Sequence, residues 1–284
     1  MNVIQTTPLL SVITPTYNRA ASLPATIESV RAQSWQDWEM VIVDDGSTDA
    51  TQERLAPYLN DARIRYFYKA NSGVGDTRNV AAQKANGEYL FFLDSDDTML
   101  PGTLEAFGKT IQDTHADVLF GSCRMVKDGT PKIKAPADLG RVFNHVKGLF
   151  LAGAFCLRRA TFTTAGGYTT TLKFSENYEL GMRVCQLPMK TAVVDHVAAD
   201  YFIDSRKRTS NSLENKLHSN LYILKTHEDL LKTDSRYLST ILSQTGYLYK
   251  ALGQRGAARR YFGKSFRVNP MNGRNLYRFL TSFL

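Results

Sequence analysis

Two short acidic clusters, each placed directly after an apolar run, constrain the fold of this 284-residue chain more than any other feature. Asp44 and Asp45 follow the run EMVIV, and residues 94–97 (DSDD) follow the run YLFFL. Short apolar runs of this kind are typical of strands buried on both faces of a parallel sheet. Open α/β sheets bind ligands at the carboxyl ends of their strands, so the pattern predicts one polar site at that edge.

The regions around these runs indicate a sheet built from β-α-β units. Apolar runs predict strands over residues 9–14, 39–43 and 88–93, and the first strand is expected to end before Pro15. Helical patterns separate the strands, as over residues 75–85. This alternation predicts an α/β fold with a mostly parallel central sheet.

The acidic clusters also predict a cation. Asp94 and Asp96 would point the same way on an extended chain, and carboxylates gathered at one sheet edge repel each other. A hard divalent ion with oxygen ligands, together with substrate phosphates, would offset this repulsion. The alternative is an acidic surface loop, which explains one cluster more readily than two.

The second half of the chain is less regular. Residues 126–141 are rich in Lys, Pro, Gly and Asp and predict an irregular excursion over the sheet. Residues 190–194 and 197–203 predict two strands. The pattern is helical from residue 213 onward, and residues 247–270 resemble one tetratricopeptide-like hairpin. One such hairpin does not bury its apolar face alone, so we expect it to dock on the α/β domain or on a partner.

Charge is distributed unevenly along the chain. The net charge is +8, yet residues 205–284 carry 15 Lys and Arg against 4 Asp and Glu, and the first 204 residues carry 20 against 23. A basic extension predicts an anionic partner, either membrane lipid or a polyanion, with an ordinary solvated surface as the alternative. The last run, RNLYRFLTSFL, puts Leu and aromatic residues on one helical face beside arginines. This face predicts peripheral membrane contact unless it packs on the preceding hairpin.

The remaining composition indicates a cytoplasmic protein. Three scattered cysteines fit neither a disulfide framework nor a zinc site, which favours a reducing compartment. The N-terminal segment does not have the pattern of a signal peptide, and no apolar run is long enough to span a membrane. We therefore expect a cytoplasmic location, with the extension at the inner face of the membrane.

The residues around the acidic clusters also carry a family resemblance. TPTYNR, VDDGSTD, SGVGDTRN and GEYLFFLDSDD occur in this order and at these spacings. Together they resemble the family 2 glycosyltransferases, densely over residues 11–102 and more thinly over residues 153–212. A set of four ordered motifs is far more specific than one Asp-x-Asp pair.

The resemblance implies an architecture. A GT-A fold, the fold of nucleotide-diphospho-sugar transferases, would occupy residues 1–210. Its nucleotide-sugar half would lie at about residues 8–100 and its acceptor half at about residues 101–210. The basic helical extension over residues 211–284 would lie outside the shared core of the family.

The resemblance also implies a donor site. The nucleotide-sugar would contact Thr14, Pro15, Tyr17, Arg19, Asp44, Asp45, Arg78, Asp94 and Ser95. A carboxylate at Asp45 suits the N3–H of uracil, so a UDP-sugar is the favoured donor. Asp94, Asp96 and Asp97 would hold Mn²⁺ or Mg²⁺, with Asp96 the central catalytic ligand. The ion would neutralise the charge that develops on the leaving diphosphate.

The acceptor side departs from the family pattern. In SENYELGMRVC the usual position of the acidic base falls on Asn177, which does not take a proton. The role would move to Glu176 or, as the weaker alternative, to Glu179, unless Glu176 merely favours the start of a helix. A downstream Tyr-Arg-x-His-like segment is replaced by YFIDSRKRTSNS. Its basic residues 206–208 would bind diphosphate as a clamp or simply begin the basic extension.

The resemblance implies an inverting glycosyltransferase that moves a sugar to an acceptor hydroxyl. The acceptor would be a carbohydrate or a lipid-linked glycan in cell-surface polysaccharide or glycolipid synthesis, and no nucleic acid partner is expected. A non-catalytic sugar-nucleotide-binding or scaffold protein is the alternative, motivated by Asn177 and the helical hairpin. A nucleotidyltransferase is less favoured, because TPTYNR is not a Gly-rich phosphate loop.

Overall fold

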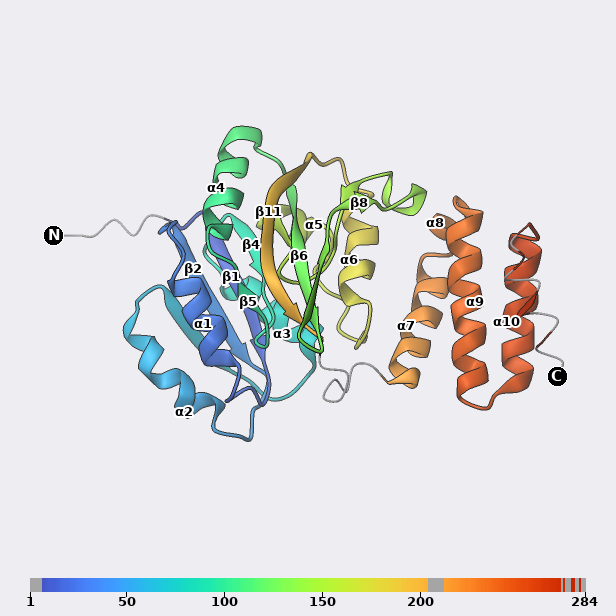
Figure 1. Ribbon diagram of the computed structural model, residues 1–284, viewed down its shortest axis with the longest axis horizontal. Coiled ribbons are helices and arrows are strands. Elements are labelled where there is room, and N and C mark those ends of the chain that lie inside the picture. Colours follow the sequence, from blue (N-terminus) through green and yellow to red (C-terminus); the bar gives the residue numbers. More distant parts are fainter. Residues whose placement is uncertain (1–6, 204–211, 272, 274–276, 279–280, 282–284) are drawn as a thin grey trace.

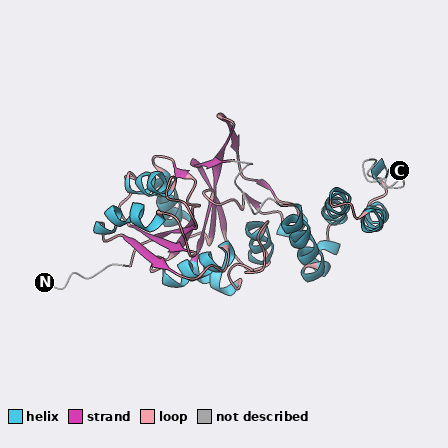
Figure 2. Cartoon of the chain, turned by 90° about the horizontal axis from the view of Figure 1, so that it is seen from below, coloured by secondary structure: helices cyan, strands magenta, loops and turns pink. Residues whose placement is uncertain are grey.

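The computed structural model describes residues 7–203, 212–271, 273, 277, 278 and 281. A curved sheet with helices on both faces forms one part of the molecule, and a group of helices extends from it (Figures 1 and 2). The predicted boundary at residue 210 falls within residues 204–211, which lie outside the described residues.

The main sheet has the strand order β3-β2-β1-β4-β10-β6-β11-β5, with β7 beside β6. β1, β2, β3, β4, β6 and β11 run in one direction, and β5, β7 and β10 run in the other. The sheet is therefore mixed and mostly parallel, as the sequence predicts. The strands are β1 (Leu10–Thr16), β2 (Trp38–Asp44), β3 (Ile64–Tyr68), β4 (Tyr89–Phe92), β5 (Thr98–Met99), β6 (Val118–Lys127), β7 (Thr130–Lys134), β10 (Phe155–Arg158) and β11 (Thr191–Phe202), with β8 (Ala137–Asp138) and β9 (Lys147–Gly148) as a separate pair.

Alternation along the central strands divides the core between the two faces of the sheet. In β2, Met40 and Ile42 join one buried cluster, while Val41 and Val43 join the other. Helices α1, α2 and α4 contribute to the first cluster, and α3, α5 and α6 contribute to the second. The helices of this domain are α1 (Leu23–Arg31), α2 (Thr51–Leu55), α3 (Val74–Lys84), α4 (Thr103–Thr114), α5 (Arg159–Thr164) and α6 (Glu176–Val184), with 3₁₀ turns at Ala56–Asn60 and Arg141–Phe143.

The first strand continues through Pro15, whereas the sequence predicts that it ends there. The neighbour β4 pairs with β1 only as far as Ile13, opposite Phe92, while β2 continues beside it to Thr16. Pro15 therefore lies where β1 has a partner on one side, and its missing N–H costs less there than in a strand paired on both sides.

The segment predicted as an irregular excursion, residues 126–141, begins with a β-hairpin instead. β6 runs to Lys127, and β7 pairs with it in antiparallel register. The two strands are joined by Asp128 and Gly129, whose φ angles of 49° and 75° suit a type I′ turn. The predicted strands at residues 190–194 and 197–203 likewise form one strand, β11, with a register shift between Val193 and Ala199.

The helical extension docks on the sheet domain. It consists of α7 (Leu213–Thr226), α8 (Glu228–Lys232), α9 (Ser235–Ala251) and α10 (Arg255–Val268). Ile223, Leu231 and Ile241 belong to the same buried cluster as residues of the sheet domain. α9 and α10 form the expected hairpin, in which Gly246 lies against the Phe262 ring so closely that a Cβ would meet it at 2.7 Å. The extension reaches the core of the sheet domain through α7, α8 and the first half of α9. Docking of residues 247–270 themselves, on the α/β domain or on a partner, stays a prediction.

Candidate active site

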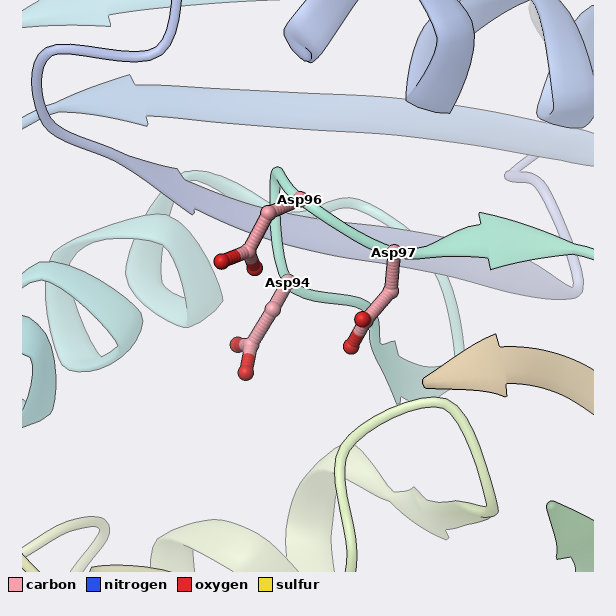
Figure 3. Close-up of side chains that lie close together, drawn as sticks. All are labelled: Asp94, Asp96 and Asp97. Carbon is pink, nitrogen blue, oxygen red and sulfur yellow. The ribbon is translucent and has the colours of Figure 1, made fainter. Parts of the chain in front are cut away.

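The second acidic cluster forms a tight loop after β4. Ser22, directly before α1, and Thr26 of α1 donate hydroxyl hydrogen bonds to the carbonyls of Ser95 and Asp97, at 2.9 and 2.8 Å. Ligand oxygens of Asp94, Asp96 and Asp97 lie within 4.8 Å of one another (Figure 3). The loop therefore gathers the three carboxylates that the sequence predicts as metal ligands.

The members of this cluster differ in exposure and in contacts. The side chains of Asp94 and Asp96 are 24% and 28% exposed. Asp97 is fully buried, and one of its carboxylate oxygens accepts a hydrogen bond of 2.9 Å from the Phe202 backbone N–H at the end of β11. Asp97 thus ties the loop to the opposite part of the sheet, while the other two carboxylates face the solvent-accessible side.

The charges around the cluster fit a divalent cation. Arg19 Nη2 lies 3.3 Å from Asp96, and Arg78 Nη2 lies 2.6 Å from Asp94. Arg78 also pairs with Glu176, so one guanidinium is shared between two carboxylates. The ligand set that Asp94, Asp96 and Asp97 offer consists only of carboxylate oxygens, which suits Mg²⁺ or Mn²⁺.

Arg78 joins the predicted donor and acceptor halves. It lies on α3 with only 2% of its side chain exposed, and Nη1 donates to Glu176 at 2.9 Å while Nη2 donates to Asp94 at 2.6 Å. The guanidinium lies 5.2 Å from the centre of the Tyr168 ring. Burial lowers the pKa of the Arg78 guanidinium. The Asp94 and Glu176 carboxylates and Tyr168 raise this pKa by more than burial lowers it, so it lies well above its usual value and the group stays charged.

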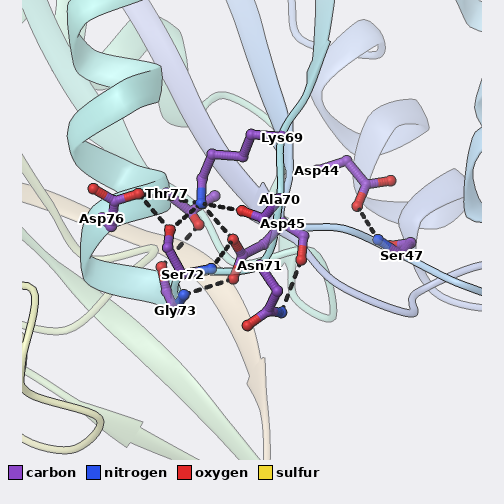
Figure 4. A network of polar contacts seen from close by, with 10 residues as sticks. All are labelled: Asp44, Asp45, Ser47, Lys69, Ala70, Asn71, Ser72, Gly73, Asp76 and Thr77. Carbon is purple, nitrogen blue, oxygen red and sulfur yellow. Dashed lines mark hydrogen bonds and ion pairs between the residues drawn. The ribbon is translucent and has the colours of Figure 1, made fainter.

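The first acidic cluster, at the end of β2, shapes the adjoining loop (Figure 4). The Asp45 carboxylate accepts hydrogen bonds of 2.8 Å from the backbone N–H groups of Ser72 and Gly73 and also contacts Lys69. Gly73 has a φ of 96°, a conformation that glycine adopts without steric cost, directly before α3. Asp44 is fully buried, and its carboxylate accepts a hydrogen bond of 2.8 Å from the Ser47 N–H.

Lys69 is a site residue that the sequence reading missed. It follows β3 and pairs with both Asp45 and Asp76, the latter at 3.1 Å. The sequence does place Lys69 directly after a predicted strand. Because that strand, β3, lies parallel to β2, its carboxyl end meets the same edge of the sheet.

The other residues that are predicted to contact the nucleotide-sugar differ in their exposure to solvent. Tyr17 is 46% exposed just beyond β1, where a ring is accessible to a ligand. Pro15 lies within β1, and Thr14 and Ser95 are buried, so they lie beneath the surface of the site. The structure brings the motif loops together, but it exposes only part of each motif.

On the acceptor side, the two candidate bases have different surroundings. Glu176 begins α6, and its side chain is 14% exposed with Oε1 bound to Arg78. Glu179 is fully buried and binds Arg183, Thr169 and His227. Asn177 accepts a 2.8 Å hydrogen bond from the Tyr168 hydroxyl. Glu176 is thus the carboxylate of this helix that lies at the cluster, and Glu179 anchors the helical extension.

The anchoring role of Glu179 predicts a pH-dependent stability. Burial raises the pKa of this carboxyl, but hydrogen bonds from His227 and Arg183 outweigh burial and lower the pKa from 4.5 to about 2. The ionised group therefore stabilises the fold above pH 4.5, and this contribution is lost as the pH falls toward about 2. The shift corresponds to roughly 3 kcal/mol.

We expect Glu179→Gln to lower the free energy of unfolding by about 3 kcal/mol near neutral pH, measured by urea denaturation. The difference from the unaltered protein should shrink as the pH is lowered. Glu228→Gln is the matched control, because Glu228 is 65% exposed in a pair with Lys232, and its loss should stay within about 0.5 kcal/mol. Equal losses in both variants, or a difference that does not change with pH, would contradict the role of Glu179.

Two predicted features fall outside the described residues. These are the basic run 206–208, proposed as a diphosphate clamp, and the apolar face of the last segment formed by Leu276, Phe279, Leu280, Phe283 and Leu284. Within the described part of the chain, no helix combines the length and the apolar character needed to cross a membrane.

An open groove of about 850 Å³ lies away from the acidic clusters. Its lining includes Asn79 of α3, Glu88 before β4 and Arg158 at the end of β10. Because β10 is antiparallel to β4, these strand ends mark the amino-terminal edge of β4. Ligands of open α/β sheets bind at the carboxyl edge, so we place the donor at the carboxylate cluster rather than in this groove.

Known proteins resemble the chain in sequence and in fold. The putative teichuronic acid biosynthesis glycosyltransferase TuaG of Bacillus subtilis is 43% identical over 138 residues, which cover 46% of this chain and 55% of that protein. S. aureus TarS, residues 1–349 in complex with UDP-GlcNAc, superimposes with a TM-score of 0.70 at 21% identity, covering 96% of this chain and 89% of that chain. The mannosyltransferase PcManGT of Pyrobaculum calidifontis, in complex with GDP-Man and Mn²⁺, has a TM-score of 0.60 at 16% identity, covering 91% and 75%.

These structural neighbours confirm the predicted GT-A-like α/β fold with its additional C-terminal helices. The match covers about half of the length of TuaG. The model of the family described as Glycosyl transferase family 2 matches residues 11–184. Since this match covers more than half of the 284 residues and contains both acidic clusters and Glu176, the chain belongs to glycosyl transferase family 2.

Proposed function

We propose that the protein is a metal-dependent, inverting glycosyltransferase that moves a sugar from a UDP-sugar to an acceptor hydroxyl. The observation that carries this proposal is the convergence of Asp94, Asp96 and Asp97 with Arg78 and Glu176 at one edge of the sheet. Residues 1–210 would form the catalytic domain and residues 211–284 its basic extension.

The donor would bind across the loops that follow β1, β2 and β4. Asp45 would accept the N3–H of uracil, since a carboxylate can accept more hydrogen bonds than the described contacts occupy. Tyr17 would lie beside the base. Arg19, now paired with Asp96, would turn to a phosphate. The side chains of Tyr17 and Arg19 are partly exposed, which leaves them accessible to a donor, whereas Asp45 is buried.

Asp94, Asp96 and Asp97 would hold Mn²⁺ or Mg²⁺, which fits their oxygen-only ligand set. When bound, the ion supplies Lewis-acid stabilisation of the negative charge on the departing diphosphate. The protein's own contribution is to hold this cluster in place through the hydroxyls of Ser22 and Thr26. Positioning of donor and acceptor supplies a further large part of the rate.

Glu176 would act as the general base. It takes the proton of the acceptor hydroxyl, whose oxygen then bonds to the anomeric carbon of the donor sugar. The bond from that carbon to the diphosphate oxygen breaks on the opposite face, which inverts the configuration. Arg78 would hold one carboxylate oxygen of Glu176, and it would thereby orient the other toward the acceptor.

The comparisons support the class of donor and pathway. One relative carries a name from teichuronic acid biosynthesis, and one structural neighbour holds UDP-GlcNAc. Another neighbour holds GDP-Man with Mn²⁺, so the fold accommodates more than one base and a divalent ion. We propose that this protein acts in cell-surface polysaccharide or glycolipid synthesis, on a carbohydrate or lipid-linked acceptor, in the cytoplasm at the inner face of the membrane.

Calorimetric titration with UDP, dTDP, GDP and CDP in the presence of Mn²⁺ tests the donor assignment. We expect UDP to bind most tightly, with dTDP next because thymine presents the same N3–H edge as uracil. Adding EDTA should weaken UDP binding, since the ion offsets the repulsion between diphosphate and carboxylates. Tightest binding by GDP would contradict the assignment of Asp45. Binding of UDP without Mn²⁺-dependent hydrolysis of any UDP-sugar would favour a non-catalytic binding protein.

A further inference from the structure

A second cavity lies where the helical extension meets the loop before α6. It has a volume of about 360 Å³, and its lining includes Phe174 of that loop, Lys216 and Asn220 of α7, Gln244 and Tyr247 of α9, and Arg278, together with two leucines of α7 and α9. Cavities of this size hold small ligands or one end of a larger one. The sheet domain and the extension each supply part of its wall.

The position of this cavity relates it to the site. Phe174 precedes Glu176 by two residues, so their Cα atoms are at most about 7 Å apart. The loop is held there by α7, because the Ser219 hydroxyl donates a 2.7 Å hydrogen bond to the Phe174 carbonyl. A chain of linked sugars with its reactive hydroxyl at Glu176 would therefore reach the cavity with its next units.

The chemistry of the lining is that of a site for an acidic sugar. Lys216 and Arg278 are cationic, and no described residue lining the cavity is acidic. The Lys216 ammonium lies 5.3 Å from the centre of the Phe174 ring, and Arg278 Nη1 donates to the Ser243 hydroxyl at 2.7 Å. Both cations are partly buried, which strengthens their attraction for an anion.

The neutral residues suit the rest of a saccharide. Asn220 and Gln244 carry carboxamides, which both donate to and accept from sugar hydroxyls. Tyr247 is 57% exposed, so one face of its ring is accessible to the apolar face of a sugar ring. Cations, carboxamides and aromatic rings in one cavity match a ligand that has charge, hydroxyls and C–H faces together.

We propose that this cavity is an acceptor subsite for an anionic saccharide, one whose units carry carboxylate or phosphate groups. The inference rests on the proposed function, because it names the class of acceptor for the same site. It also gives the extension a purpose, since the extension supplies five of the six residues that we assign to the subsite.

Calorimetric titration at low salt with three probes tests the proposal: tetragalacturonate, a glycerol phosphate tetramer and the neutral maltotetraose. We expect at least one anionic probe to bind and maltotetraose to bind at least tenfold more weakly. The tighter of the two anionic probes identifies carboxylate or phosphate as the charged group. Equal binding of maltotetraose, or no binding of either anionic probe, would overturn the proposal.

Variants locate the binding. Lys216→Gln combined with Arg278→Gln should weaken the anionic probe about tenfold or more, because each removes a charged hydrogen-bond donor. The control Lys250→Gln with Arg267→Gln removes the same charge from exposed positions of α9 and α10 outside the cavity. It should change the dissociation constant less than twofold. Tyr247→Ala should weaken binding, and Tyr247→Phe should preserve it. Equal loss in the control would indicate diffuse attraction to the basic extension and would overturn the site.

Two further measurements separate this proposal from others. UDP binding should be unchanged in the Lys216 and Arg278 variant, and Asp96→Ala should still bind the anionic probe. If the probe binds as described but UDP does not bind, the proposed function fails and the anion site stands. Co-sedimentation with phosphatidylglycerol vesicles that depends on Lys216 and Arg278, without saccharide binding, would overturn the proposal in favour of a membrane contact.

Discussion

Replacement of Asp96 by alanine is expected to reduce sugar transfer by about a thousandfold or more, since metal coordination supplies several kcal/mol of charge stabilisation. The Asp96 side chain belongs to the carboxylate cluster and is 28% exposed. Its removal takes away a proposed ligand and also relieves repulsion between carboxylates. The variant should therefore lose activity and Mn²⁺ binding while its melting temperature stays close to that of the unaltered protein.

The initial rate of transfer from a UDP-sugar, electron paramagnetic resonance of bound Mn²⁺ and thermal unfolding together check this expectation. Asp113→Ala is the matched control, because Asp113 is an exposed carboxylate on α4, outside the carboxylate cluster. It should leave all three measurements unchanged. Full activity of Asp96→Ala, or of the unaltered protein in EDTA, would refute metal dependence at this cluster.

The variant Glu176→Gln is expected to cut transfer by about two to four orders of magnitude, which is the usual contribution of a positioned general base. Glutamine keeps an oxygen that can accept the hydrogen bond from Arg78, so the local geometry should persist. UDP should bind as before, because the change lies on the acceptor side. Rates measured at saturating donor and UDP titration of the same sample check both parts.

Two neighbours on α6 provide the controls for this variant. Glu179→Gln should mainly lower stability, since Glu179 is buried and anchors His227. Asn177→Asp in the Glu176→Gln background asks whether the usual family position can take over. If Glu179→Gln abolishes transfer in a folded protein, or if Glu176→Gln retains its activity, the assignment of the base is wrong.

Features that depend on a short stretch of sequence could be predicted. A continuous apolar run predicted that β2 is buried on both faces, and the acidic residues directly after β2 and β4 predicted the sheet edge at which we propose that the donor binds. These features depend on a strand's side chains pointing alternately to its two faces, which any short segment reveals. The tetratricopeptide-like hairpin was also predicted from a local pattern, because the 3.6-residue repeat of apolar residues lies within the single helix α9.

Two features of the sheet had local sequence patterns that neighbouring residues obscured. The hairpin of β6 and β7 turns at Asp128 and Gly129, a pair that favours a type I′ turn. The surrounding Lys and Pro residues of β7 are exposed, because this strand lies at an edge, and they obscured its pattern. Similarly, the register shift in β11 divided one strand into two apparent runs.

The amino-acid sequence alone was enough to predict the family, the β-α-β order of the first half of the chain and the acidic residues that follow β2 and β4. The pairing of these groups is visible only in the folded chain: Arg78 bridges Asp94 and Glu176, which is 98 positions away from Arg78, and the buried Glu179 contacts His227. The repeat of apolar residues along one helix or strand shows which face of that element is buried, because all the residues that produce the repeat lie in the same short segment. An ion pair between distant residues depends instead on how the sheet closes and how the helices pack, and no local pattern carries that information.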